Sequence, residues 1–333
     1  MQKSFILYLF LTLLGGFSQI LSYPVSYRRL VRPDGRCVDL IGDFHKSLTT
    51  PTKSEAALVD RINELAEEKP LTVIWEYNEH ATRVRSSNAA LLALDNQEPG
   101  TIFLQDGPDQ LSNKIDFRAA DCRPYELNVL LGMHNARITA QREAKSKNHE
   151  EALFRQQCQI LGVTHPRECK PALKAFFNSV EVVEKKVEAL QENVAAADYQ
   201  HLRKAVENLK VKRDLAQREF NEKSEQFFSL FSQGGYSETN KKSAEGLLNF
   251  FGFDVFDMNV LAEIFSTKNQ VVVYAGLWHC NALEQALIKH GFSKQKDILG
   301  ENNNSDYCKR TRHESPVSEA TIYALSQKTW TSL

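Results

Sequence analysis

The segment Cys37-Val-Asp-Leu-Ile-Gly42 decides the fold class, because a short apolar run that ends at a glycine is typical of a buried strand. Asp43-Phe-His45 follows it, and residues 54–68 then place apolar side chains at helical spacing. Strand, loop and helix in this order form the repeating unit of α/β proteins. We therefore expect a sheet whose strands alternate with helices.

Further strands and helices are expected on both sides of a long helical stretch. Leu71-Thr-Val-Ile-Trp75 is a second apolar run, and it leads directly into Glu76. The other expected elements are strands at residues 101–104, 114–117, 270–274 and 321–325, and helices at residues 81–94, 255–265 and 280–290. This alternation predicts an α/β fold with one mostly parallel central sheet, flanked by helices and closed by elements from both ends of the chain.

Helical patterns dominate residues 124–250. One apolar stripe consists of Val180, Val183, Val187, Leu190 and Val194, and a similar stripe continues at Leu202, Val206, Leu209, Ala216, Phe220 and Phe227. The stripes predict two long coiled-coil-like helices, either as an antiparallel hairpin that turns near residues 197–199 or as one long helix. Packing on the protein's own core is favoured over a partner-binding arm.

The patterns divide the chain into five parts. They are a signal peptide at residues 1–22, a first α/β half at 23–123, a helical insertion at 124–250, a second α/β half at 251–300 and a polar C-terminal tail at 301–333. Lys3 precedes a short apolar stretch at residues 5–17, which is the layout of a secretory signal. We expect a secreted, periplasmic or cell-surface protein with no membrane association once the signal is removed.

Composition and motifs exclude several functions. The chain has 41 lysines and arginines against 42 aspartates and glutamates, so no overall positive charge attracts nucleic acid. The sequence contains no Gly-x-Ser-x-Gly elbow, no phosphate-binding loop, no His-Glu-x-x-His helix and no paired Cys-x-x-Cys zinc motif. The common nucleotide-binding and hydrolase classes are therefore disfavoured.

Six cysteines are compatible with disulfides in an exported protein. Cys158 and Cys169 are close in sequence and flank a glycine and a proline, so we expect a local disulfide between them. For Cys37, Cys122 and Cys280, which lie beside expected strands, buried reduced thiols are an equal alternative.

Polar side chains follow three of the expected strands. Asp43 and His45 follow the first, Glu76 and Glu79 follow the second, and His279 follows the strand at 270–274. Binding and catalytic residues in open parallel sheets gather beyond the carboxyl ends of the strands. These side chains are therefore expected to meet at one edge.

Asp121 and Arg123 follow the strand at 114–117 and can add a carboxylate and a guanidinium to the same edge. Histidine transfers protons near neutral pH, a carboxylate orients it or binds a cation, and arginine neutralises a developing oxyanion. The alternative for each residue alone is structural. A histidine at a strand end is commonly hydrogen-bonded within the fold, and Glu76 can cap a following helix.

Both histidines lie in a Gly-x-x-His turn between strand and helix, from Gly42 to His45 and from Gly276 to His279. Together with Glu76, Asp121-x-Arg123 and Tyr274-Ala-Gly-Leu-Trp-His279, these turns resemble the superfamily of erythromycin-esterase-like, haem-binding ChaN-like, TraB and TIKI proteins. The resemblance covers the motifs and their flanking strands and does not extend to the helical insertion.

The resemblance implies two βα halves that face one site, with His45, Glu76, Arg123 and His279 in it. That superfamily includes hydrolases, among them proposed metal-dependent proteases, as well as ligand-binding proteins. These four residues are our expected catalytic residues. Asp43, Glu79, Asp121 and Tyr274 are our expected substrate-binding residues.

An exported hydrolase that cleaves an ester or peptide-like bond of a small molecule or peptide is the leading functional hypothesis. His45 and His279 are candidate ligands of a divalent metal, zinc or manganese. One alternative is a non-enzymatic protein whose cleft binds haem or another ligand while its helical insertion docks a protein partner. Another is a secreted helical interaction protein with a degenerate α/β core.

Expression in an exporting host should remove residues 1 to about 22 and leave a soluble, folded product, because no second long apolar stretch follows the signal. N-terminal sequencing of the exported protein measures this. A mature chain that begins at Met1 and partitions into detergent would contradict the prediction.

Overall fold

The structure is a computed structural model that describes residues 20–21, 24–43, 46–47, 53–76, 111–160, 163–232 and 246–295. Several expected features lie outside these residues: most of the signal peptide, His45, Glu79, Cys308, the helix at 81–94 and the strands at 101–104 and 321–325.

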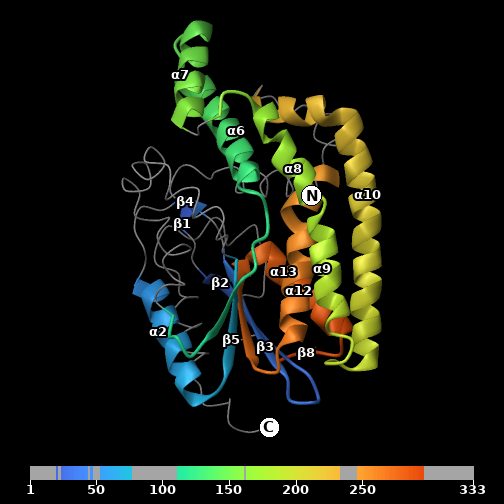
Figure 1. Ribbon diagram of the computed structural model, residues 1–333. Coiled ribbons are helices and arrows are strands. Elements are labelled where there is room, and N and C mark those ends of the chain that lie inside the picture. The colour runs from blue at the N-terminus through green and yellow to red at the C-terminus, as the bar shows by residue number, and fades with distance from the viewer. Residues whose placement is uncertain are drawn as a thin grey trace.

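Within the described residues, six strands form one mixed sheet (Figure 1). Their order across the sheet is β6 (Asp116–Ala119), β5 (Leu71–Trp75), β7 (Gln270–Gly276), β3 (Cys37–Asp43), β2 (Pro24–Val31) and β8 (Ser293–Lys294). The first four run parallel to one another, whereas β2 and β8 are antiparallel to their neighbours. The α/β class and the mostly parallel sheet are therefore confirmed. Two short strands, β1 (Ile20–Leu21) and β4 (Lys46–Ser47), pair separately.

Strand β2 was missed by the sequence analysis, because two arginines interrupt its apolar pattern. Both are paired in the structure: Arg29 Nε donates to Asp39 at 2.8 Å, and Arg28 Nη1 donates to Glu284 at 2.7 Å. The turn from β2 to β3 contains Gly35 with φ of 83°, a conformation that glycine adopts without strain. Neutralised charges thus allow β2 to lie inside the sheet.

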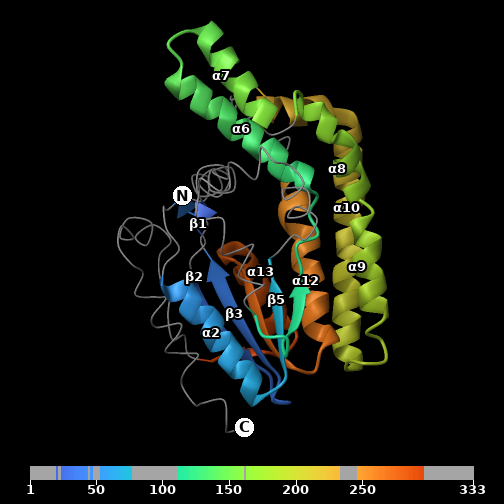
Figure 2. The same cartoon turned by 60° about the vertical axis from the view of Figure 1, so that its left-hand side comes forward.

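Helices cover both faces of the sheet (Figure 2). Those whose bounds lie within the described ranges are, in chain order, α2 (Lys53–Glu68), α6 (Tyr125–Glu143), α7 (Lys147–Ile160), η3 (Pro166–Cys169), α8 (Lys170–Phe176), α9 (Ser179–Glu188), α10 (Ala196–Ser232), η4 (Phe250–Asp254), α12 (Val255–Ser266) and α13 (Leu277–Lys289). One face packs on α2, where Ile62 and Leu65 share an apolar cluster with Trp75 and Tyr274. The other face belongs to a larger cluster that includes residues of α9, α10, α12 and α13.

The helices α9 and α10 form an antiparallel hairpin, so the alternative of one long helix is wrong. Arg213 pairs with Glu181 at 2.5 Å, and Lys210 pairs with Glu184, so residue numbers rise along one helix as they fall along the other. The turn occupies residues 189–195, just before the expected position. The expected apolar stripes are almost entirely buried, which confirms that they pack on the protein's own core.

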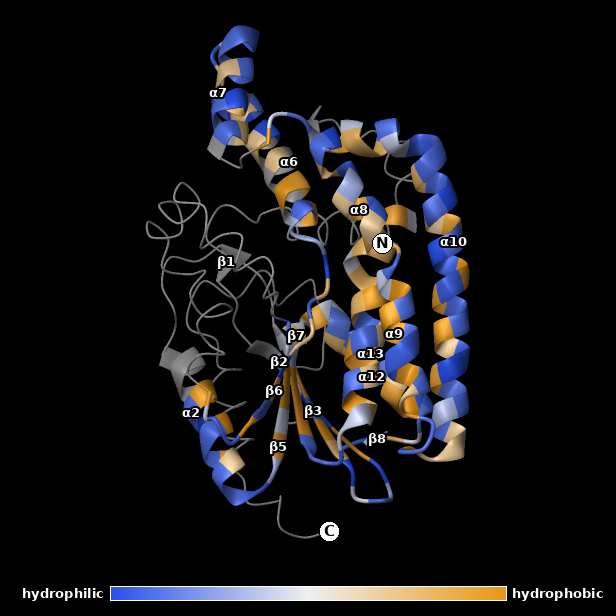
Figure 3. Cartoon of the chain, in the orientation of Figure 1, coloured by the Kyte–Doolittle hydropathy of each residue, from blue (hydrophilic) through white to orange (hydrophobic). Residues whose placement is uncertain are grey.

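Hydrophobic residues lie along the strands and on the helices that face them, whereas α7 and α10 are mostly hydrophilic (Figure 3). Within the described ranges, none of the helices has both the length and the apolarity needed to cross a membrane.

The expected disulfide between Cys158 and Cys169 is wrong. Both thiols are free and buried, one on α7 and the other at the end of η3. Burial raises the pKa of Cys158 to about 11 and that of Cys169 to about 12. The two side chains belong to the large apolar cluster, where cysteine acts as a small hydrophobic residue. Among the described cysteines, Cys37, Cys122 and Cys280 are likewise in no disulfide.

Gly42 allows β3 to approach α13, and its replacement should destabilise the fold. A Cβ atom at Gly42 would lie 2.3 Å from Ser26 Oγ and 3.3 Å from Leu277 Cα. We expect Gly42→Ala to lower the free energy of unfolding by about 1–3 kcal/mol, measured by urea denaturation. Gly252→Ala is the matched control, because a Cβ there has no neighbour within 4 Å. Equal losses in the two variants would contradict the prediction.

Candidate active site

The carboxyl ends of the four parallel strands lie side by side. Trp75 of β5 is in register with Ala119 of β6 and with Tyr274 of β7, and Asp43 of β3 is in register with Gly276 of β7. Neighbouring strands in a sheet are about 4.8 Å apart. Residues that directly follow these strands therefore share one edge of the sheet.

Glu76, the first residue after β5, has both carboxylate oxygens engaged. Its Oε2 accepts a hydrogen bond from the backbone N–H of Gly276 at 2.7 Å, and its Oε1 accepts one from Arg123 Nη2 at 2.5 Å. The Glu76 backbone N–H donates to the carbonyl oxygen of Tyr274 at 2.9 Å. Since Gly276 is the N-cap residue of α13, the carboxylate also lies where a helix favours negative charge.

Arg123 joins two buried carboxylates. Its Nε and Nη2 donate to the two oxygens of Asp121 at 2.7 and 2.8 Å, in addition to the bond with Glu76. Burial opposes the charge of Arg123, but the carboxylates of Asp121 and Glu76 outweigh it and raise the pKa of the guanidinium. The guanidinium also lies 5.3 Å from the centre of the Phe256 ring. Arg123 is therefore a fixed positive charge between the ends of β5 and β6.

His279 lies in the first turn of α13 and is held by Asp257 of α12. Its Nδ1 is 2.6 Å from Asp257 Oδ1, and its Nε2 is 3.6 Å from Glu76 Oε1. The ring packs against Phe253 and Phe256, with centroid separations of 5.2 and 4.3 Å. A carboxylate that accepts a hydrogen bond from Nδ1 leaves Nε2 as the basic nitrogen. Asp257 thus orients the imidazole so that Nε2 faces Glu76.

Asp257 is the site residue that the sequence analysis missed. It lies within helix α12 and follows no strand, so its position relative to the strands gave no indication of a role. The available signal was a carboxylate in the predominantly apolar segment 255–265, which also contains Asn259 and Glu263. Burial raises the pKa of Asp257, the charges of Glu76 and Asp254 add to this effect, and the hydrogen bond with His279 opposes it.

The structure places the other expected site residues as follows. Glu76, Asp121, Arg123 and His279 are brought together, and Tyr274 contributes its backbone carbonyl to this group. The Tyr274 ring belongs to the cluster on the α2 face, where it stacks on Trp75 at 4.4 Å. Asp43 ends β3 beside Gly276, and His45 and Glu79 lie outside the described residues.

The described side chains do not fit a metal site. Among them, no group of three His, Cys, Asp or Glu side chains is placed to hold an ion. Both oxygens of Glu76 already accept hydrogen bonds, and Nδ1 of His279 is bound to Asp257. Nε2 of His279 is a possible metal ligand at this position, but one imidazole nitrogen does not make a metal site.

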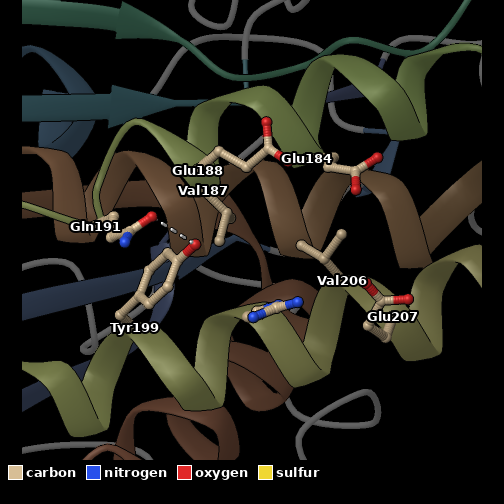
Figure 4. A pocket seen from close by; sticks show the side chains of 8 residues that line it. Glu184, Val187, Glu188, Gln191, Tyr199, Val206 and Glu207 are labelled. Carbon is tan, nitrogen blue, oxygen red and sulfur yellow. Dashed lines mark hydrogen bonds between the residues drawn. The ribbon is translucent and has the colours of Figure 1, made fainter.

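A separate groove of about 490 Å³ lies between α9 and α10 (Figure 4). Glu184, Glu188, Glu207 and Arg203 line it, together with Tyr199, whose hydroxyl donates to Gln191 at 3.4 Å. The groove shares no residue with the group around His279. Its lining residues belong to α9, to α10 and to the turn between them.

Comparison with family models, with curated proteins and with solved structures finds no match.

Loss of Arg123 should destabilise the protein strongly. Arg123→Met leaves Glu76 and Asp121 buried without their countercharge, which should lower the free energy of unfolding by about 3–5 kcal/mol. The control is Arg118→Met, since Arg118 is more exposed and pairs with Asp116 and Glu263 nearer the surface. It should lose about 1 kcal/mol or less. Chemical denaturation of both variants measures the difference, and similar losses would contradict a buried charge network.

Proposed function

We propose that the chain is an exported hydrolase of ester or peptide-like bonds, in which His279 is the general acid–base residue. The observation that supports this proposal is the 2.6 Å contact between His279 Nδ1 and Asp257, which directs Nε2 to the carboxyl edge of the parallel strands. A carboxylate that holds one nitrogen of a histidine favours the tautomer whose other nitrogen accepts a proton.

In the proposed reaction, Nε2 of His279 takes a proton from a water molecule as the water oxygen attacks the carbonyl carbon. The bond from that carbon to the leaving oxygen or nitrogen then breaks, and His279 returns the proton to the leaving group. The products are a carboxylic acid and an alcohol or amine. Between the two proton transfers His279 is a positively charged imidazolium. The Glu76 carboxylate, which lies 3.6 Å from Nε2, stabilises this charge.

Arg123 has a positioning role in this mechanism. Its bonds to Asp121 and Glu76 hold the Glu76 carboxylate beside the histidine. Phe253 and Phe256 pack on the imidazole and limit the access of water to it, which strengthens the electrostatic interactions.

We further propose that His45 joins this site as a second base or as a metal ligand. Asp43 is in register with Gly276, and His279 follows Gly276 by three residues. His45 follows Asp43 by two residues, a length of chain that spans at most about 7 Å. Asp43 is the last residue of β3, and Glu79 follows the end of β5 by four residues in the sequence. We propose that both contact the substrate.

Removal of the histidine should strongly lower the rate of hydrolysis without unfolding the protein. We expect His279→Gln to lower kcat/KM by about 10²- to 10⁴-fold on p-nitrophenyl esters or fluorogenic casein. Asp257→Asn should cause a smaller loss, because the base remains but loses its orientation. His290→Gln is the matched control, since His290 is also buried and lies 3.3 Å from a carboxylate, that of Asp198. It should retain activity.

Cofactor measurements separate the alternatives. Stoichiometric zinc or manganese that is lost in His45→Ala would add metal assistance to the hydrolase. A wild-type protein that cleaves none of these probes and develops a Soret band on haem titration would replace the proposal with ligand binding. Equal activity in the wild type, His279→Gln and Asp257→Asn would also overturn it.

A further inference from the structure

Helix α10 carries a second stripe that faces away from the core. It consists of Lys204, Asn208, Val211, Leu215, Arg218 and Glu222, and all six residues are exposed. Their spacing alternates between four and three, which is the heptad pattern of a coiled-coil seam. Val211 is 59% exposed and Leu215 is 54% exposed, although both are large apolar side chains. In Figure 1, α10 lies at the outside of the molecule.

The apolar residues and the charged end residues of this outer stripe are equally spaced on either side of Arg213. Val211 and Leu215 lie two residues on either side of it, and Lys204 and Glu222 lie nine residues on either side. A second α10 packed in the antiparallel direction would therefore place Val211 against Leu215 of the partner subunit. It would place Lys204 against Glu222 of the partner subunit. A parallel arrangement would instead bring like charges together.

The charged ends of the stripe are available for such contacts. In the described part of the chain, neither Lys204 nor Glu222 forms a salt bridge, whereas Arg213 and Lys210 pair with residues of α9. The backbone of Lys223 departs from helical geometry, with φ of −125° and ψ of 19°. The regular helix thus extends through Glu222, where the stripe ends.

We propose that the outer face of α10 binds a second copy of this chain in the antiparallel direction. The contact has an apolar centre and a Lys–Glu pair at each end, and its twofold symmetry makes the same surface complementary to itself. Val182 of α9, which is 57% exposed, adds apolar surface at the same level of the hairpin, because its neighbour Glu181 pairs with Arg213. One pair of helices buries a small area, so the dimer should form in a concentration-dependent way.

Sedimentation velocity of the full exported chain tests this surface. The wild type should shift from monomer to dimer between about 1 and 500 µM, a range typical of a weak specific contact. The double variant Val211→Glu, Leu215→Glu should weaken dimerisation at least about tenfold, because it buries like charges at the centre. Ile288→Glu is the control: Ile288 is also an exposed apolar residue, at 42%, but it lies on α13. It should dimerise like the wild type.

A charge exchange tests the direction of the helices. Lys204→Glu or Glu222→Lys alone should weaken the dimer by placing like charges together, and the double variant should restore it. Circular dichroism confirms that each variant remains folded. A wild type that stays monomeric at all concentrations would overturn the proposal. So would a dimer that Val211→Glu, Leu215→Glu does not affect, or a charge exchange that restores nothing.

Discussion

The buried carboxylate of Glu76 is the interaction on which the arrangement around His279 depends. Its two oxygens join the guanidinium of Arg123 to the backbone amide of Gly276, so the ends of β5, β6 and β7 are tied at one point. A buried carboxylate without such partners would cost several kcal/mol. Because α13 begins directly after Gly276, the same contact determines where His279 lies.

A second buried charge network lies on the same sheet, but it is centred on Asp39 within β3 and not at the carboxyl ends of the strands. Asp39 of β3 accepts hydrogen bonds from the hydroxyl of Tyr27 at 2.6 Å, from Arg29 Nε at 2.8 Å and from Gln270 at 2.8 Å. This network joins β2, β3 and β7, and it contains no histidine. It explains how charged residues are accommodated within the sheet. The network around Glu76 differs because it includes an imidazole and lies at the carboxyl ends of the strands.

Helix α10 of the hairpin has two stripes on opposite faces, one buried and one exposed. The inner stripe of α10, with Leu202, Leu209 and Phe220, is buried in the main core. The outer stripe, centred on Val211 and Leu215, has the spacing of a coiled-coil seam but remains exposed. Since both stripes repeat at intervals of three and four, periodicity alone does not distinguish a core-facing stripe from a solvent-facing one. Packing against α9 makes that distinction.

The elements of the sheet that have local apolar patterns could be predicted from the sequence. Six elements were expected close to their observed bounds: the strands β3, β5 and β7 and the helices α2, α12 and α13. Their apolar patterns involve residues only a few positions apart and are therefore visible in the sequence. β2 could not be predicted in this way. Its arginines are tolerated only because Asp39 and Glu284, which lie on other elements, neutralise them.

The sequence by itself determined which residues follow the strands, and therefore that Glu76, Arg123 and His279 would lie at one edge of a parallel sheet. Only the tertiary structure decided that Asp257, from a helix, holds the histidine, and that Cys158 and Cys169 remain separate thiols in the core. The physical reason is distance along the chain. A strand or helix is specified by residues a few positions apart, whereas the partners of Glu76 are 47 and 200 residues away and are chosen by packing.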